Sequence, residues 1–425
     1  MNHRFVVPLV LVLFGAPLGT VPVKSQSTGP SAPASGEAVT QLEAWLRAAR
    51  DERAPLTNSA FASVPLTRAD ADRAAALLWK DHAAWIRATR TNEMTAGVIE
   101  LNGLRLRFET LSFGDTNQLP AGGRSLFLSL HGGGNARPAV NDSQWRNQLR
   151  LGRDYAPSEG IYLAPRAPTD TWNLWHEAHI DRFFDRLIEN LIVLERVNPD
   201  RVFVMGYSAG GDGVFQLAPR MADRWAAAAM MAGHPNETLP FGLRNVPFAL
   251  QAGALDSAYK RNEVTAEWGR KLDELQRADP EGYAHFTEIH AGKRHWMDLE
   301  DKKAVPWMEK FTRNRLPLRI VWRQDDVAHD RFYWLALPPG TARQGQEVFA
   351  ERNGSTFSVR AKDAARLLIR LNDEMADLDQ PITIRSGERI LFSGRGSRTI
   401  TVLARTLDER GDPRLVFSAE TAVDL

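Results

Sequence analysis

The chain has 425 residues, 43% hydrophobic and 25% charged, and its 53 Lys and Arg against 52 Asp and Glu leave a net charge of +1. This composition excludes a wholly disordered chain, and the length predicts two or three domains. A charge near zero argues against a general nucleic-acid-binding protein, which normally carries a basic excess. Cysteine is absent, which excludes disulfides, thiolate metal sites and a cysteine nucleophile.

The N-terminus predicts an export signal. Arg4 precedes an apolar stretch from Phe5 to Phe14, which is shorter than the ~20 residues needed to cross a bilayer. Val23 and Ser25 have the spacing of a cleavage site, so we expect a signal peptide over 1–25. The mature protein is then secreted or periplasmic, with no stable membrane insertion. A stretch rich in Ser, Pro, Gly and Ala predicts a flexible linker over 26–37.

A helical N-terminal segment is expected over 38–94. Apolar residues at helical spacing predict helices over 39–50 and 68–86, the second with Thr67 as its N-cap. The pair Asn102-Gly103 then separates two alternating runs, and this is the strongest short-range sign of a β-hairpin.

Strand and helix patterns alternate from the hairpin onward. Alternation of this kind is typical of a mostly parallel sheet with helices on both faces, and we place this layer at 95–316. The expected strands cover 125–130, 160–163, 201–205, 225–231, 247–252 and 285–290, and the expected helices cover 180–196, 210–219, 257–277 and 301–313.

Short β-type runs separated by glycines follow, and they predict a small β-rich domain over 317–425 with one helix at 400–410. This domain either stabilises the α/β layer or binds a polymer or surface, and the sequence leaves both roles open.

Two motifs indicate nucleophilic catalysis. Gly206-Tyr207-Ser208-Ala209-Gly210 lies between a predicted strand and a predicted helix, where G-x-S-x-G is typical of a nucleophile elbow. Ser208 is therefore the candidate nucleophile. His131-Gly132-Gly133-Gly134 ends an earlier strand, and we expect backbone N–H groups of Gly132, Gly133 and Ala209 to form an oxyanion hole.

A serine nucleophile needs an oriented base. Asp256 follows the strand at 247–252, and His295 lies on the loop after the last strand. The order Ser208, Asp256, His295 is that of α/β-hydrolase triads. Asp212, near the nucleophile, is either a helix-start carboxylate or a substrate contact. The formal alternatives for base and acid are His131, His234, His285, His290, Asp298 and Asp301.

Aromatic residues near these motifs are candidates for substrate contacts. The loop at 170–179 lies at the sheet edge where a pocket is expected, although ordinary packing under the loop is the alternative. His176 and His179 lack the i, i+4 spacing of a zinc pair, so no metal site is predicted. The candidate contacts are His131, Tyr207, Trp172, Trp175 and Trp296.

The region from about 95 to 315 resembles an α/β-hydrolase serine esterase and is most similar to the polyhydroxybutyrate depolymerase, feruloyl esterase and esterase D-like group. The elbow followed by Gly211, the glycine motif at 131–134 and the late histidine loop carry this resemblance. It implies that an ester, small or polymeric, is hydrolysed through an acyl-enzyme without metal or organic cofactor. A serine peptidase and a non-catalytic binding protein on a hydrolase scaffold are the alternatives.

Overall fold

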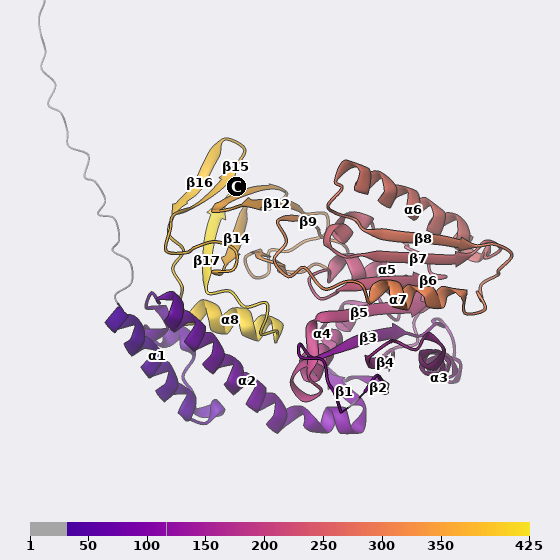
Figure 1. Cartoon of the computed structure of the whole chain (residues 1–425), viewed down its shortest axis with the longest axis horizontal. Coiled ribbons are helices and arrows are strands. Elements are labelled where there is room, and N and C mark those ends of the chain that lie inside the picture. The colour runs from indigo at the N-terminus through magenta and orange to yellow at the C-terminus, as the bar shows by residue number, and fades with distance from the viewer. Residues whose placement is uncertain (1–31, 116) are drawn as a thin grey trace, which may run out of the picture.

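A computed structural model describes residues 32–115 and 117–425 of the chain (Figure 1). The expected signal peptide at 1–25 and the first part of the expected linker lie outside these residues. Figure 1 shows a helical arm at the N-terminus, a central α/β layer and a β-rich C-terminal domain packed together.

The N-terminal arm consists of two helices, and it corrects the predicted linker. Helix α1 begins at Ala32, so residues 32–37 are helical rather than flexible. The reason is packing: Ser35 is buried, and its hydroxyl donates to Asp70 Oδ2 at 2.5 Å. Thr67 caps α2 as predicted. The elements are α1 (Ala32–Arg47), the 3-10 turns η1 (Arg50–Glu52), η2 (Leu56–Asn58) and η3 (Ala60–Ser63), and α2 (Arg68–Ala96).

The central sheet has eight strands in the order β1-β2-β4-β3-β5-β6-β7-β8. The predicted hairpin supplies the antiparallel pair β1 and β2, and β2 also runs antiparallel to β4. The remaining five pairs are parallel. The expected mostly parallel sheet is therefore confirmed. The strands are β1 (Val98–Leu101), β2 (Leu104–Phe113), β3 (Arg124–Leu130), β4 (Gly160–Arg166), β5 (Val197–Tyr207), β6 (Ala227–Met231), β7 (Phe248–Gly253) and β8 (His285–His290).

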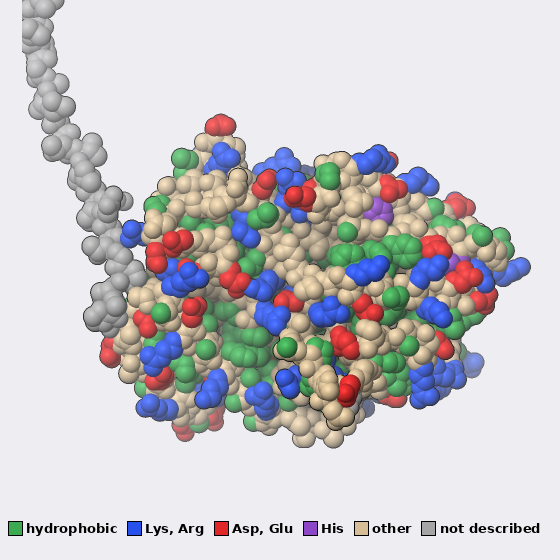
Figure 2. Space-filling model, in the orientation of Figure 1, with side chains coloured by type: hydrophobic (Ala, Val, Ile, Leu, Met, Phe, Trp, Pro, Cys, Tyr) green, Lys and Arg blue, Asp and Glu red, His purple; other side chains and the backbone are tan. Residues whose placement is uncertain are grey.

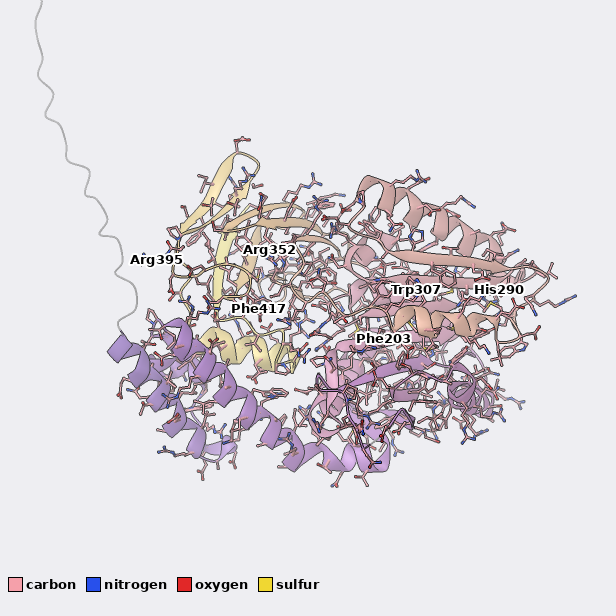
Figure 3. The ribbon with its side chains drawn as sticks, viewed as in Figure 1. Phe203, His290, Trp307, Arg352, Arg395 and Phe417 are labelled. Atoms are coloured by element: carbon pink, nitrogen blue, oxygen red, sulfur yellow. The ribbon has the colours of Figure 1, made fainter. Side chains whose placement is uncertain are left out.

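Helices cover both faces of this sheet. One face packs against α4, α5 and α6, and the other packs against α3 and α7. On the second face Phe203 of β5 stacks on Phe127 at 4.8 Å, and Trp307 of α7 belongs to the same layer (Figure 3). The bounds are α3 (Pro138–Tyr155), α4 (Ala178–Leu194), α5 (Ala209–Arg220), η4 (Pro240–Asn245), η5 (Ala258–Lys260), α6 (Arg261–Ala278), η6 (Glu300–Lys303) and α7 (Ala304–Met308).

Three helix predictions need correction. Helix α3 was not expected, and it covers part of the segment between β3 and β4. Helix α6 begins later than predicted because Tyr259 and Lys260 adopt left-handed φ values of 55° and 56°. The helix expected at 301–313 is only the short η6 and α7, because the chain then turns so that the Arg313 N–H reaches Asp200 O at 2.9 Å.

The C-terminal domain contains two sheets, of order β10-β11-β14-β17 and β16-β15-β13-β12-β9, and helix α8. Helix α8 packs with Leu403 and Leu407 against Val39, Leu42 and Leu78 of the N-terminal arm. Strand β17 was not predicted. The elements are β9 (Arg319–Arg323), β10 (Arg331–Phe332), β11 (Leu335–Ala336), β12 (Glu347–Asn353), β13 (Thr356–Lys362), β14 (Arg366–Leu371), β15 (Ile382–Ser386), β16 (Arg389–Gly394), α8 (Ile400–Arg410) and β17 (Ala419–Asp424).

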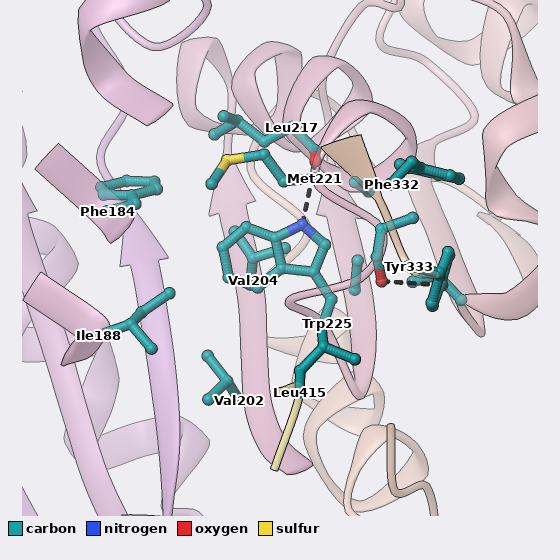
Figure 4. Close-up of a cluster of buried hydrophobic side chains, with 14 of the residues drawn as sticks. Phe184, Ile188, Val202, Val204, Leu217, Met221, Trp225, Phe332, Tyr333 and Leu415 are labelled. Carbon is teal, nitrogen blue, oxygen red and sulfur yellow. Dashed lines mark hydrogen bonds between the residues drawn. The ribbon is translucent and has the colours of Figure 1, made fainter. Parts of the chain in front are cut away.

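The C-terminal domain shares a hydrophobic core with the catalytic layer. Trp225, just before β6, lies beside Tyr333 and Leu415 of the C-terminal domain (Figure 4). Its indole N–H donates to Leu217 O at 2.9 Å, and the Tyr333 hydroxyl donates to Ala222 O at 3.0 Å. The C-terminal domain is thus packed against the α/β layer through a continuous core.

Two hydrogen bonds from Arg352 also fix the junction between the two domains. Arg352 of β12 donates to Leu316 O at 2.8 Å and to Met375 O at 3.2 Å (Figure 3).

Acidic and basic side chains are interspersed over the face shown in Figure 2. No helix within 32–115 and 117–425 is both long and apolar enough for a membrane span.

Candidate active site

Ser208 lies at a sharp turn between β5 and α5, with φ 58° and ψ −122°. Two glycines make this turn possible. A Cβ on Gly206 would lie 2.3 Å from Gly210 O, and one on Gly210 would lie 2.1 Å from Leu130 O. The Ser208 N–H donates to Met231 O at 2.9 Å, which ties the turn to β6. The backbone therefore places the hydroxyl at the N-terminus of α5, where developing negative charge is favoured.

The structure brings the three predicted residues into one hydrogen-bonded relay. His295 Nε2 lies 3.0 Å from Ser208 Oγ, and His295 Nδ1 lies 2.7 Å from Asp256 Oδ2. The Asp256 side chain is 2% exposed, whereas that of His295 is 42% exposed. With Nδ1–H donating to the carboxylate, Nε2 is left to accept the serine proton.

The other histidines and acids considered from the sequence lie outside this relay. His290 contacts Gln251 and Glu300, and His285 contacts Asp273. Asp301 accepts from the buried Tyr155 hydroxyl at 2.6 Å. These contacts account for the three side chains as parts of the fold.

Tyr207 and Arg261 support the relay. The Tyr207 hydroxyl donates to His295 O and accepts from Met297 N–H at 3.2 Å, which fixes the histidine loop. Burial raises the pKa of Tyr207 well above its usual range, so the hydroxyl stays a donor. Arg261 is 9% exposed, and its Nη1 lies 3.9 Å from Asp256 Oδ1, the carboxylate oxygen that His295 does not use. Sequence reasoning did not identify this arginine.

The glycine loop passes directly beside the nucleophile. A Cβ on Gly132 would lie 3.1 Å from Ser208 Cβ. Within the described part of the chain, the backbone N–H groups of Gly132, Gly133 and Ala209 have no hydrogen-bond partner, so they are available to a substrate oxyanion. The Gly134 N–H instead donates to Asn141 Oδ1 at 2.9 Å.

Two predicted substrate contacts are core residues instead. His131 and Trp175 are each 0% exposed. His131 Nδ1 lies 2.6 Å from Gly132 O, its Nε2 accepts from Ala167 N–H at 3.2 Å, and the Trp175 indole donates to His131 O at 2.8 Å. Burial lowers the pKa of His131 to about 4, so the ring is neutral and consistent with these bonds. Both side chains hold the oxyanion loop in place rather than touch substrate.

A cleft of about 630 Å³ opens in front of Ser208 and His295. Tyr207 and Trp296 line it, as expected for two of the candidate contacts, while Trp172 is 58% exposed but outside its lining.

The opposite wall of the cleft comes from the unpredicted helix α3. Residues at helical spacing form the buried face of α3, but most of them are polar or small, so no hydrophobic pattern marks the helix. These residues are Asn141, Trp145, Gln148, Gly152 and Tyr155.

Asp212 lies outside the cleft lining, one turn after Ser208. Its Oδ1 accepts from His234 N–H at 2.6 Å, and burial raises its pKa to about 6. It is therefore a packed helix-start carboxylate. Among the described residues, carboxylates of Glu237, Asp325 and Asp326 lie within 4.8 Å of one another, but they do not border the cleft.

The strand order, the strained elbow after β5 and the Ser–His–Asp relay together define a serine hydrolase with the α/β-hydrolase fold. No family model and no curated protein matches the chain.

Solved structures do align with about half of the chain. A thermostable esterase covers 51% of this chain and 62% of its own, with 17% identity and a TM-score of 0.39. A ferulic acid esterase covers 49% and 99%, with 16% identity and a TM-score of 0.34. A carboxylesterase of Bacillus cereus covers 54% and 98%, with 13% identity and a TM-score of 0.35.

Proposed function

We propose that this protein hydrolyses carboxylic esters through an acyl-enzyme on Ser208. The observation that carries the proposal is the relay from Asp256 through His295 to Ser208, which opens onto a cleft beside unpaired backbone N–H groups. These are the parts that acyl transfer needs: a nucleophile, an oriented base and donors for the oxyanion.

In the acylation step, His295 Nε2 takes the Ser208 proton while Oγ attacks the ester carbonyl carbon. The carbonyl oxygen becomes an oxyanion and accepts hydrogen bonds from Ala209 and the Gly132-Gly133 loop, each donor worth about 10²–10³ in turnover. Protonated His295 then gives its proton to the departing alcohol. Asp256 stays ionised and stabilises the imidazolium.

Deacylation repeats the sequence with water. His295 takes a proton from water, the hydroxide attacks the acyl carbon, and the carboxylic acid leaves as Ser208 recovers its proton. The half-exposed His295 can be reached by this water from the open cleft.

The finer proposal concerns substrate and location. The cleft offers Tyr207, Trp296 and Leu151 as apolar contacts for an acyl group, which suits hydroxyalkanoate-type or feruloyl-type esters. The resemblance of the elbow and glycine motifs to those esterases supports the same substrate range. The apolar stretch after Arg4 supports export to the periplasm or the medium.

Hydrolysis of p-nitrophenyl acetate, butyrate and decanoate and of methyl ferulate tests the proposal, with Ser208→Ala beside the wild type. We expect turnover that Ser208→Ala abolishes, and the preferred acyl group gives the size of the site. Cleavage of peptide anilides but of no ester would instead indicate a peptidase. No turnover of either kind would indicate a binding protein.

A further inference from the structure

The catalytic cleft is elongated along α3, and its two ends differ chemically. Gln144 lies at the nucleophile end of the cleft. Its Oε1 would be 3.6 Å from a Cβ added to Gly132, the glycine that passes beside Ser208. Arg150 lines the same cleft six residues later. At ~1.5 Å per residue, this places it about 9 Å further along the helix axis.

Arg150 has no acidic partner. No carboxylate of the described residues lies within 4.0 Å of its guanidinium, not even Asp154, which lies one helical turn away and also lines the cleft. The guanidinium donates instead to Asn147 Oδ1, another lining residue on the nucleophile side of Arg150. Arg150 is the only lysine or arginine among the described residues that line this cleft.

The cleft also offers apolar contacts, beside the polar Asn147 and Gln148 of α3. Leu151, Tyr207 and Trp296 line the cleft with Ser208, and Trp296 is 46% exposed. An exposed tryptophan in a cleft is a good contact for a methylene chain or an aromatic ring. The arrangement is thus a nucleophile, an apolar section and an unpaired cation.

From this arrangement, and resting on the proposed ester hydrolysis, we propose that the cleft selects esters whose acyl part ends in a carboxylate, which Arg150 binds. An anion at this position gains a charge-assisted hydrogen bond from a guanidinium that has no carboxylate of the described residues within 4.0 Å. The substrate class is a monoester of a dicarboxylic acid, with an apolar spacer of about 9 Å between the scissile carbonyl and the free carboxylate.

The test compares methyl hydrogen suberate with dimethyl suberate, which has the same chain and no charge. We expect Arg150→Gln to lower the ratio of kcat/KM for the monoanion over the diester by about tenfold. Arg150→Lys keeps part of the ratio, and dimethyl suberate, which offers Arg150 no anion, is the internal reference for each variant.

Arg153→Gln is the matched control, because Arg153 is an exposed arginine of the same helix that does not line the cleft. Its ratio should stay within about twofold of wild type, as for an ordinary surface charge. An unchanged ratio in Arg150→Gln, or an equal loss in Arg153→Gln, overturns the inference while leaving ester hydrolysis intact.

If the wild type hydrolyses neither suberate ester, turnover of the p-nitrophenyl esters still decides the proposed function, and calorimetric binding of methyl hydrogen suberate to Ser208→Ala decides the subsite. Binding that Arg150→Gln removes supports the subsite. Binding that this substitution leaves unchanged, or no binding to Ser208→Ala at all, overturns it.

Discussion

The catalytic edge of the sheet and its contact with the C-terminal domain are built from different interactions. At the catalytic edge, two hydrogen bonds link Ser208, His295 and Asp256, and the histidine is half-exposed. At the domain contact, ion pairs are buried in the core. The residues of these buried ion pairs, here called the seam, are Asp200, Asp223, Arg313, Arg410 and Asp412.

The geometry of the seam explains why it matters for stability. Arg313 Nη2 lies 2.8 Å from Asp200 Oδ1 and 2.8 Å from Asp412 Oδ2, and so connects β5 to the segment after α8. Losing one partner of a buried pair leaves an unpaired charge, which costs about 3–5 kcal/mol. The comparison teaches that substitutions at the catalytic edge should change rate, whereas substitutions at the seam should change stability.

Asp256→Asn should have the largest effect, a loss of about 10⁴-fold in kcat for ester hydrolysis. The amide keeps the shape of the side chain but no longer fixes the His295 tautomer or stabilises the imidazolium. Thermal unfolding followed by circular dichroism should show a melting temperature close to that of the wild type. A large fall in melting temperature with intact kcat would contradict the separation of the two regions.

Asp223→Ala should show the opposite behaviour. Asp223 accepts hydrogen bonds from the Arg410 guanidinium and, through Oδ2 at 2.9 Å, from the Tyr333 N–H. The substitution leaves both donors without their partner. We expect the free energy of unfolding in urea to fall by about 3–5 kcal/mol, with kcat for the folded protein unchanged. Glu388→Ala, at an exposed turn of the C-terminal domain, is the control and should alter neither quantity.

Acid should loosen the seam. Burial alone would raise the pKa of Asp223, but the charges of Arg410 and Arg224 outweigh it and hold that pKa below 3.8. Because the folded-state pKa is depressed, the stabilisation is present above pH 3.8 and is lost as the pH falls through the folded-state value. Urea unfolding between pH 6 and pH 3 should show this loss, and Asp223→Ala should show less of it. Equal acid sensitivity in both proteins would exclude Asp223 as its source.

Substitution of Asp212, near the nucleophile, should have the smallest effect on stability. The pH dependence of that effect has the opposite sign to that of Asp223. Burial raises its pKa to about 6, so the folded state retains its proton, and stability falls as the pH rises from 3.8 through 6. Asp212→Asn keeps an oxygen for the His234 N–H and should raise the free energy of unfolding at pH 8 by about 1–2 kcal/mol. At pH 4 we expect no gain, and a gain of equal size there would contradict the protonation account.

Local patterns were enough to predict much of the catalytic edge. The elbow needs Gly206 and Gly210 for steric reasons that the sequence displays, and the order of Ser208, Asp256 and His295 follows from the strands that precede them. The Asn102-Gly103 hairpin and helix α8 were also found from short-range signals.

Other parts depend on contacts that a single sequence does not show. The buried face of α3 consists largely of polar and small residues such as Asn141, Gln148 and Gly152, so it lacks the hydrophobic stripe that identifies a helix. Whether Trp172 or Trp175 is buried depends on how one loop folds, and the structure buries Trp175 completely while leaving Trp172 exposed.

The seam could not be predicted for a related reason. Its charged residues are far apart in the chain, from Asp200 to Asp412, and each one alone resembles an ordinary surface charge. Only the folded arrangement pairs Asp223 with Arg410 across the domain contact.

The most direct test of the central claim is covalent labelling of the protein with a fluorophosphonate, followed by mass spectrometry of its peptides. The relay predicts one adduct per chain, on the peptide that contains Ser208, and none in folded Ser208→Ala. Labelling that persists in Ser208→Ala, or a folded wild type that takes no label, would contradict the assignment of Ser208 as an activated nucleophile.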